Sequence, residues 1–263
     1  DWEETFYLDR NQGPSKIIDV PDLRVKNYNT GQWSYHIQTS IIDADEDHVI
    51  IVTNGTYYEN VVIDKEGLTL QGLYSDRVNY EVIIDAQNSG CAVVIQRDYV
   101  TLRGFNITNS FEDDDPLYSS GIKIKTDFNI VENNLITDSY VGILLDKAEY
   151  NTIQNNSIDA VDIGIMLARS NLNTIQYNVI HSADEHDIEI GKFGYSDTGS
   201  QSNNIIDNKE IEKIYFEDSS TNLLLDQTVG TIELVDSVRN SAISSEYQYV
   251  ICDSDSSFYL KNF

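Results

Sequence analysis

Cysteine is nearly absent from this chain of 263 residues, which contains only Cys91 and Cys252. Two cysteines are too few for a scaffold held by disulfides, and they do not show the C-x-x-C spacing of a metal site. We therefore expect two free, buried thiols, with a long-range or intermolecular bridge as the alternative.

Basic residues are scarce as well. The chain has 17 Lys and Arg against 44 Asp and Glu, which gives a formal net charge of −27 at pH 7. Because no basic patch is present, this charge argues against nucleic acid as a partner. The acidity fits a surface adapted to high salt, a site for divalent cations, or simple solubility, and charge alone does not separate these three readings.

Long hydrophobic runs are also missing. No apolar stretch approaches the ~18 residues of a membrane span, so we expect no transmembrane segment in this chain. The first ten residues, DWEETFYLDR, do not resemble a signal peptide, and the chain starts at Asp1 rather than Met. We expect a processed or excised segment, from which a leader or anchor could have been removed.

Repetition is what this chain has in abundance. Residues 142–158 read GILLDKAEYNTIQNNSI, and 22 residues later the chain reads GIMLARSNLNTIQYNVI. Two columns recur at a strict interval of 22 residues, namely Asn134, Asn156 and Asn178, and Ile136, Ile158 and Ile180. A repeat of about 20 to 29 residues cannot bury its apolar face alone, so it stacks on its neighbours as a solenoid.

Alternating apolar residues predict that this solenoid is built from strands. The segments GIKIK, GILLD and GIMLA begin at Gly121, Gly142 and Gly164, and period two places their apolar side chains on one face. A leucine-rich horseshoe is the main alternative, but Ile-rich rows and Asn-rich turns favour a β-helix. Asn tolerates the left-handed backbone of a tight corner, and stacked Asn side chains can hydrogen-bond from coil to coil. The predicted fold is all-β, a single-stranded parallel β-helix.

The region before the repeat supports the same fold. Its characteristic residues are Ile37, Gln38, Gly55, Thr56, Tyr57, Glu59, Leu68, Thr69, Leu70 and Gly72. In these residues the chain resembles the right-handed parallel β-helix proteins of the pectin-lyase-like superfamily. The likeness is closest to the carbohydrate-binding or sugar-hydrolysis repeat domains of archaeal and bacterial surface proteins and of the periplasmic accessory protein of nitrous oxide reductase.

This resemblance implies a right-handed coil, a glycan as partner, and an extracellular, cell-surface or periplasmic location. A role in metal delivery is a further implication, but four His and a single Met argue against a copper carrier. We expect one domain over residues 1–263. Residues 1–44 would form an N-terminal cap with a short helix, 45–225 the stacked coils, and 226–263, where the period is lost, an irregular C-terminal cap or an assembly segment.

The catalytic motifs of enzymes with this fold are missing. Polygalacturonase-like hydrolases would need a Gly-His-Gly segment and pectin methylesterases an Asp-Phe-Ile-Phe-Gly segment, and the chain contains neither. It also lacks a nucleophile elbow and a His-Glu-x-x-His zinc motif.

Candidate binding residues come from outward positions and turns. One outward row is predicted to contain Lys123, Leu144, Met166 and Glu189, with Lys125 and Asp146 beside it as a cross-coil charge pair. Tyrosine rings stack on sugars while their hydroxyls bond to them. The candidate tyrosines at turns and loops are Tyr118, Tyr140, Tyr150 and Tyr195.

Two acidic segments are candidates for a metal site. Asp113, Asp114 and Asp115 could surround Ca²⁺, which binds six to eight oxygens, although adjacent acids in a turn are usually just solvated. Asp184 and His186 lie in the densest mixture of ligand types, where only a sharp turn could converge more than two of them on one ion.

The sequence leaves two functions open. The first is a non-catalytic β-helix of the cell surface that binds glycans, assembles into an envelope layer, or does both. The second is a polysaccharide lyase or glycoside hydrolase acting on an acidic polysaccharide, with Ca²⁺ as a possible cofactor.

Overall fold

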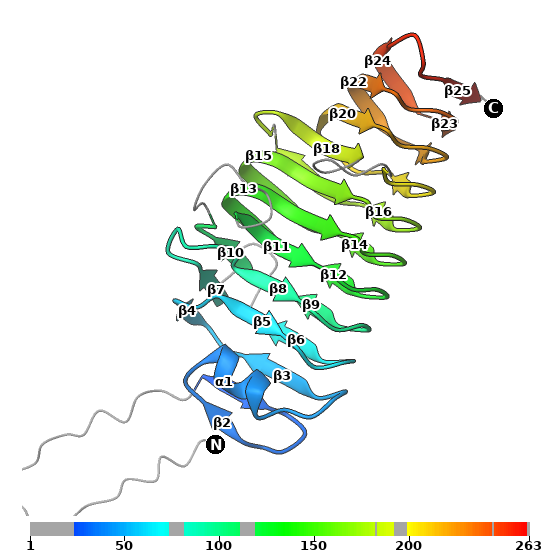
Figure 1. The fold of residues 1–263 in the computed structure, drawn as a ribbon. Helices are drawn as coiled ribbons and strands as arrows, with labels where there is room; N and C mark the ends of the chain where they lie inside the picture. Colours follow the sequence, from blue (N-terminus) through cyan, green and yellow to red (C-terminus); the bar gives the residue numbers. More distant parts are fainter. Residues whose placement is uncertain are drawn as a thin grey trace, which may run out of the picture.

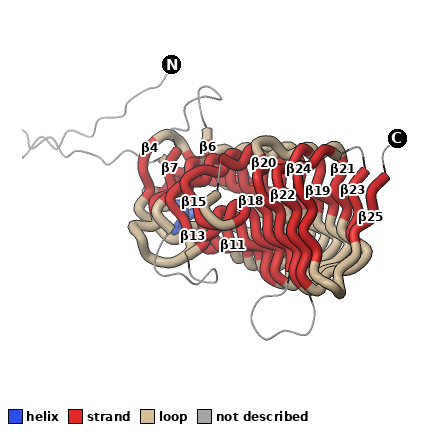
Figure 2. Tube along the Cα trace, turned by 90° about the horizontal axis from the view of Figure 1, so that it is seen from above, coloured by secondary structure: helices blue, strands red, loops and turns tan. Residues whose placement is uncertain are grey.

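The computed structural model describes residues 24–73, 82–110, 119–181, 183–191, 199–243 and 245–261. These residues form a right-handed parallel β-solenoid of about 8 turns, as predicted. Figure 1 shows the chain winding from α1 at the N-terminal end to β25 at the C-terminal end, and Figure 2 shows the strands lying side by side along the axis. Residues 1–23 of the expected N-terminal cap lie outside the described residues.

Two long sheets run along the solenoid. Sheet A contains, in spatial order, β2 (Trp33–Ser34), β1 (Val25–Asn27), β3 (Val49–Val52), β6 (Thr69–Gly72), β9 (Thr101–Arg103), β12 (Ile130–Glu132), β14 (Thr152–Gln154), β16 (Thr174–Gln176), β19 (Asn204–Ile206), β21 (Leu223–Leu225), β23 (Asn240–Ile243) and β25 (Phe258–Lys261). Only the pairings of β1 with β2 and β3 are antiparallel within the described residues.

Sheet B lies across the core from sheet A. Its strands, in chain order, are β4 (Gly55–Tyr57), β5 (Val61–Ile63), β7 (Val82–Asp85), β8 (Val93–Ile95), β10 (Asn106–Thr108), β11 (Ser120–Ile124), β13 (Leu135–Asp146), β15 (Ser157–Ala168), β17 (Val179–His181), β18 (His186–Gly191), β20 (Ile211–Glu217), β22 (Thr228–Val235) and β24 (Glu246–Cys252).

The predicted alternation places aliphatic side chains inside the coil. Ile143 of β13 lies in register with Ile165 of β15, and Ile165 with Ile188 of β18. All three are fully buried, and the core they belong to is continuous along the solenoid. Because each turn supplies isoleucine, valine or leucine at the same positions, the core is a stack of similar layers.

The asparagine column forms the predicted ladder. Asn156 Oδ1 accepts the backbone N–H and the side-chain N–H of Asn134, each at 3.1 Å. Asn178 Oδ1 accepts the same two groups of Asn156, each at 3.0 Å. Because these amides are buried, every coil is tied to the next by polar groups that have no water to bond to instead.

A second ladder runs along the other side of the same strands, and the sequence analysis missed it. Its members are Asn129, Asn151, Asn173, Asn203, Asn222 and Asn240, each bonded through its backbone N–H to the Oδ1 of the next. The two ladders therefore lie on either side of strands β12, β14, β16 and β19 of sheet A.

The paired asparagines of the repeat divide two roles between them. Asn133 and Asn155 take left-handed backbone conformations, with φ of 55° and 54°, whereas Asn134 and Asn156 follow them and form the ladder. The first asparagine forms the corner, because asparagine adopts the left-handed backbone conformation at low cost. The second points its side-chain amide into the interior.

The glycines that begin the repeated segments are required by close backbone approach. A Cβ on Gly142 would lie 2.6 Å from the carbonyl oxygen of Gly164 and 2.7 Å from Ile158 Cγ2. A Cβ on Gly164 would lie 2.5 Å from the carbonyl oxygen of Asp187. Any side chain at these positions would push neighbouring coils apart.

The predicted N-terminal helix is α1 (Ile37–Ile42), and Glu59 of the following coil caps it. The Glu59 carboxylate accepts the backbone N–H of Ile37 at 3.0 Å and of Gln38 at 2.9 Å. The Gln38 side chain bonds to both the backbone N–H and the carbonyl of Val62, at 2.7 and 3.2 Å. This explains why Ile-Gln and a later Glu occur together in the sequence. Over the described part of the chain, no helix has the length and hydropathy to span a membrane.

The C-terminal residues continue the solenoid where the sequence suggested an irregular cap or assembly segment. Strands β22 to β25 stack in parallel register on β20 and β21. The ladder interval falls to 19 residues between Asn203 and Asn222 and to 18 between Asn222 and Asn240. The corners between these last strands are shorter, so the 22-residue period is lost although the coils continue. The two cysteines do not form a disulfide with each other, but the expected burial is wrong for both, because Cys91 is half-buried and Cys252 is exposed.

Replacing Asn156 by Ala tests the ladder. The change removes the acceptor of two buried N–H groups of Asn134, so we expect the free energy of unfolding to fall by about 2–4 kcal/mol. Asn155→Gly is the matched control, because Asn155 is exposed and left-handed, and we expect a change within about 0.5 kcal/mol. Urea denaturation measures both, and equal effects would contradict the ladder's role.

Candidate functional site

The outer face of sheet B carries a straight row of side chains from successive coils. The predicted row of Lys123, Leu144, Met166 and Glu189 is confirmed by the strand register. The register extends it to Tyr215 of β20 and Glu233 of β22. Adjacent members lie about 4.8 Å apart along the axis, which is the spacing of neighbouring strands.

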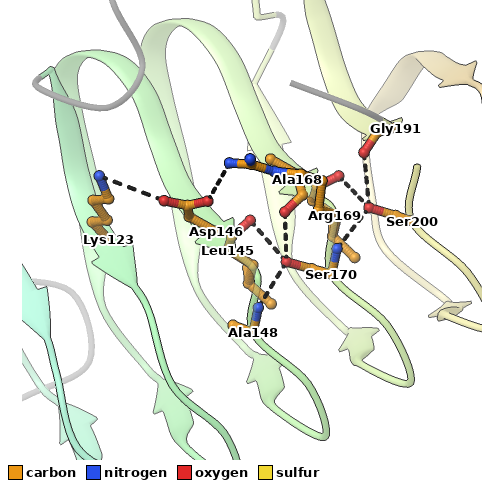
Figure 3. A network of polar contacts seen from close by, with 10 residues as sticks. Lys123, Leu145, Asp146, Ala148, Ala168, Arg169, Ser170, Gly191 and Ser200 are labelled. Atoms are coloured by element: carbon orange, nitrogen blue, oxygen red, sulfur yellow. Dashed lines mark hydrogen bonds and ion pairs between the residues drawn. The ribbon is translucent and has the colours of Figure 1, made fainter. Parts of the chain in front are cut away.

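A charged network lies at the N-terminal end of this row. Asp146 Oδ1 accepts a hydrogen bond from Arg169 Nη2 at 2.7 Å, and Asp146 Oδ2 lies 3.9 Å from Lys123 Nζ (Figure 3). These side chains are mostly buried, with exposures of 14% for Asp146, 11% for Lys123 and 21% for Arg169. One carboxylate therefore balances two cations at the surface of the sheet.

This network corrects the predicted charge pair. Asp146 bonds to Lys123 and Arg169, and it does not pair with Lys125, whose side chain is exposed. Lys125 follows the last residue of β11, so the strand alternation that was used to place it beside Asp146 no longer applies there.

Buried serines hold the corner that carries Arg169. Arg169 has a φ of 53°, and the next residue, Ser170, accepts the backbone N–H of Ala148 at 3.1 Å. Ser170 donates to the carbonyl of Leu145 at 3.0 Å, and its own N–H bonds to Ser200 at 2.9 Å (Figure 3). The corner is thus fixed on both sides, and the guanidinium is held over Asp146.

An apolar cluster separates the two charged ends of the row. It contains Val141, Leu144, Ile163, Met166 and Ala168, all of them buried, and Tyr140 packs against it. These residues face away from the main core, so this outer surface of sheet B has a small hydrophobic centre of its own. Tyr140, a predicted ligand-binding residue, lies beside it and is half-buried.

A histidine, a carboxylate and a tyrosine meet at the C-terminal end of the row. His186 Nδ1 lies 3.0 Å from Glu189 Oε2, and the His186 ring stacks on Tyr215 with centroids 4.6 Å apart and planes within 7°. Burial, together with Glu217 and Glu189, raises the pKa of Tyr215 to about 12, so its hydroxyl stays protonated at neutral pH. A carboxylate that orients an imidazole beside a phenol can bind sugar hydroxyls or move a proton.

Asp187 sits beside this group but has a structural role. It is buried, and its carboxylate accepts the backbone N–H groups of Ala183 at 3.1 Å, Glu212 at 2.6 Å and Lys213 at 2.8 Å. Burial raises its pKa, and the backbone hydrogen bonds oppose that shift only in part.

The predicted metal ligands do not converge within the part of the chain that the structure describes. There, no group of three or more His, Cys, Asp or Glu side chains is placed to hold a metal ion. Asp184 is exposed, and His186 bonds to Glu189 instead. Asp113, Asp114 and Asp115 lie outside the described residues, so Ca²⁺ binding there stays a prediction.

Of the three remaining candidate tyrosines, the structure describes only Tyr150. Tyr118 and Tyr195 lie outside the described residues. Tyr150 is half-exposed at a corner of the solenoid, and its ring stacks on Phe128 with centroids 5.0 Å apart and planes within 4°. One face of that ring is therefore occupied by a neighbouring coil.

Most of this site gave a weak signal in the sequence. Repeat alignment identified Asp146 and Glu189 but not Arg169, which follows the aligned strand and reaches back to Asp146 of the preceding coil. Tyr215 lies 26 residues beyond Glu189 rather than 22, because the chain between them is longer. Only the register of β18 with β20 places the two side by side.

Comparison with known proteins agrees with this architecture. Residues 71–229, more than half of the chain, match the family described as the right handed beta helix region, and the chain belongs to this family. No curated protein matches the chain in sequence.

Similar solved structures include an alginate lyase from Paenibacillus sp. str. FPU-7, with 12% identity, a TM-score of 0.55, and coverage of 85% of this chain and 94% of the lyase chain. The enzymatically active domain of tailspike protein 2 from bacteriophage CBA120 has 12% identity, a TM-score of 0.60, and coverage of 86% and 40%. A GH87 α-1,3-glucanase catalytic domain has 14% identity, a TM-score of 0.52, and coverage of 73% and 40%. At these identities the likeness shows the fold alone.

Substituting Asp187 by Ala tests its structural role. Three backbone N–H groups lose their acceptor, so we expect the free energy of unfolding to fall by about 2–4 kcal/mol. Asp184→Ala, at an exposed position of the same corner, is the control and should change stability by less than about 0.5 kcal/mol.

The effect of Asp187→Ala should also depend on pH. Because the folded pKa is raised above 3.8, the stability from Asp187 is complete at pH values below 3.8 and declines as the pH rises through the folded pKa. Urea denaturation near the ordinary carboxyl pKa and at neutral pH should therefore show the larger loss at the lower pH. A larger loss at neutral pH would contradict this assignment.

Proposed function

We propose that this chain is a non-catalytic β-helix protein of the cell exterior that binds a polysaccharide along the outer face of sheet B. The Lys123, Asp146 and Arg169 network carries the proposal. It fixes a guanidinium at the sheet surface, in line with polar groups of later coils. A straight row of this kind suits an extended polymer, because successive sugar units meet successive coils.

Arg169 has donors left over for a ligand. A guanidinium carries five N–H groups, and the bond to Asp146 uses one of them. Its Nε is buried and has no hydrogen-bond partner among the described residues. Because Nε is inaccessible from solvent, the remaining Nη N–H groups would be the donors for a sugar hydroxyl.

The charge of this face favours a neutral glycan. Lys123, Arg169 and Lys213 lie among the carboxylates of Asp146, Glu189, Glu217 and Glu233, so the face has no excess of positive charge, and Lys213 Nζ lies 3.5 Å from Glu233 Oε2. The chain as a whole carries −27, so it repels anionic polymers at a distance. The ring of Tyr215 would contact the carbon-bound hydrogens of sugar rings.

Polysaccharide cleavage is the second candidate, and the His186, Glu189 and Tyr215 group favours it. A lyase needs a base that removes a proton beside a uronate carboxylate, and an imidazole held by a carboxylate is such a base. The similar solved structures include an alginate lyase and the catalytic domain of an α-1,3-glucanase. Their identity to this chain is too low to transfer an activity.

A glycan array followed by titration calorimetry tests the binding proposal. We expect wild type to bind neutral glycans and Arg169→Met to bind them about tenfold or more weakly, since hydrogen bonds to a charged group are among the strongest. Arg239→Met is the matched control, because Arg239 is exposed and also left-handed, with a φ of 58°. No binding across the array, or equal binding by both variants, would reject the proposal.

The same preparations decide between binding and cleavage. Wild type and Glu189→Gln are each incubated with the neutral glycans that bind. Both are also incubated with a panel of acidic polysaccharides in the presence of Ca²⁺. Under the binding proposal, no new reducing ends or unsaturated products form. Products that wild type releases and Glu189→Gln does not would establish the lyase or hydrolase instead.

Assembly into a layer is the other part of the proposed role, and strands β24 and β25 support it. They are the last strands of the described residues, and their large exposed side chains are Tyr249, Ile251, Tyr259 and Leu260. Exposed apolar residues on a sheet edge favour pairing with another chain.

Light scattering should show that the average molecular mass of the protein rises with its concentration. Ile251→Lys should reduce this rise, because Ile251 is 54% exposed on β24 and a charge there would disfavour contact with a second chain. Thr231→Lys, on the interior strand β22, is the control. A monomer at every concentration would remove assembly from the proposal.

A further inference from the structure

Sheet A presents a second regular outer face, on the side of the solenoid away from the site described above. Strands β6, β9, β12, β14 and β16 follow one another along the axis (Figure 1). Each contributes two outward side chains, which form two parallel rows. The first row, in register, is Thr69, Thr101, Ile130, Thr152 and Thr174.

The threonine hydroxyls of this row are available to a ligand. All four threonines are partly exposed, and none of their hydroxyls bonds to another of the residues that the structure describes. Hydroxyls spaced at about 4.8 Å per coil repeat at nearly the length of one sugar unit in an extended polysaccharide.

The second row is a chain of hydrogen-bonded polar side chains. Arg103 Nη2 donates to Gln71 Oε1 at 2.9 Å, and Arg103 Nη1 lies 3.5 Å from Glu132 Oε1. Gln154 Nε2 donates to Glu132 Oε2 and Gln176 Nε2 to Gln154 Oε1, each at 2.8 Å. These contacts hold the side chains in place, and the single cation and single anion cancel.

Stacked rings line the corner beside the threonine row. Tyr99 stacks on Phe128 with centroids 5.2 Å apart, and Phe128 stacks on Tyr150 at 5.0 Å. The rings are 55%, 42% and 49% exposed, so they do not fill the core. Each precedes an outward residue of the first row by two positions, and the stacked rings turn their edges, including two tyrosine hydroxyls, to solvent.

The three rings stand on a left-handed backbone. Tyr99, Phe128 and Tyr150 have φ values of 61°, 59° and 56°, a region that disfavours bulky side chains. At the opposite corner of the same coils, Asn133 and Asn155 meet the same requirement at lower cost. Bulky side chains also take this conformation at Leu172, in the next coil of this corner, and at Tyr177, at the opposite corner. Ring stacking recovers part of the cost, and the three exposed rings give this corner an aromatic surface that a ligand can contact.

We propose that the outer face of sheet A between β6 and β16 binds a linear, neutral polysaccharide that lies parallel to the solenoid axis, with one sugar unit per coil. The threonine hydroxyls and glutamine amides bond to sugar hydroxyls, and the ring edges at the corner contact the polymer along its side. The ligand is neutral because the two charges of the face cancel and the chain as a whole repels anions. This face is separate from the one on sheet B and does not depend on it.

Binding to insoluble polymers tests the proposal. Depletion isotherms are measured on microcrystalline cellulose, chitin and insoluble α-glucan, with soluble polygalacturonate as the acidic comparison. The first variant combines Thr101→Val, Thr152→Val and Thr174→Val, which keep the side-chain shape and suit strands. The second is Tyr150→Asn, which removes a ring and suits the left-handed backbone. Thr231→Val on sheet B and Arg239→Met, at an exposed corner outside both faces, are the controls. Arg169→Met is measured separately as the reporter of the sheet B face, and thermal unfolding confirms that all variants fold.

We expect wild type to bind at least one neutral polymer. The triple variant should bind it about tenfold or more weakly, since each lost hydrogen bond contributes roughly a factor of two to ten. Tyr150→Asn should also weaken binding, whereas both controls should match wild type on that polymer. Wild type that binds none of the neutral polymers, prefers polygalacturonate, or is matched by the triple variant would overturn the proposal. A loss seen only with Arg169→Met would instead assign the binding to sheet B.

Discussion

Each buried asparagine of the two ladders accepts a backbone N–H of the preceding coil, and most of them also accept the side-chain N–H of the asparagine there. Asn156, for example, accepts from Asn134 and donates its own amide to the carbonyl of Val131 at 3.0 Å. Such a group is satisfied only when the next coil lies directly above it. The ladders therefore fix the register of the solenoid, and the aliphatic core fills the space that they define.

Exact stacking also determines what the outer faces can do. Because each coil repeats the last, an outward residue becomes one member of a straight row, as Glu189 does between Met166 and Tyr215. Sheet B uses this to align charged networks around an apolar centre, and sheet A to align hydroxyls, amides and ring edges. Straight rows on both faces are the basis for the proposal that each binds a long, repeating ligand.

The fold was largely predictable from the sequence, because side chains at ladder and core positions have few substitutes. Asn134, Asn156 and Asn178 recur at one interval since the intervening corners have one length. Asn129, Asn151 and Asn173 carry the same signal, which the analysis overlooked. Beyond Asn173 the interval changes to 30, 19 and 18 residues, so the continuing coils could not be recognised by period.

The site was less predictable because it depends on corners and loops rather than on strands. Alternation placed Lys125 beside Asp146, but β11 ends before Lys125, and Arg169 reaches Asp146 from a left-handed corner. The stacking of His186 on Tyr215 joins residues of neighbouring coils that no repeat aligns. Long-range contacts of this kind become visible only when the coils are in place.

Amide hydrogen exchange, resolved by residue, tests the stacking most directly. The backbone N–H groups of Asn134, Asn151 and Asn156 each bond to a ladder oxygen in the next coil at 2.8 to 3.1 Å. The account predicts that they exchange only through opening of the whole solenoid, as slowly as core amides such as those of β13 and β15. Exchange of these three amides at the rates of unprotected peptide would show that the ladders do not hold the coils together.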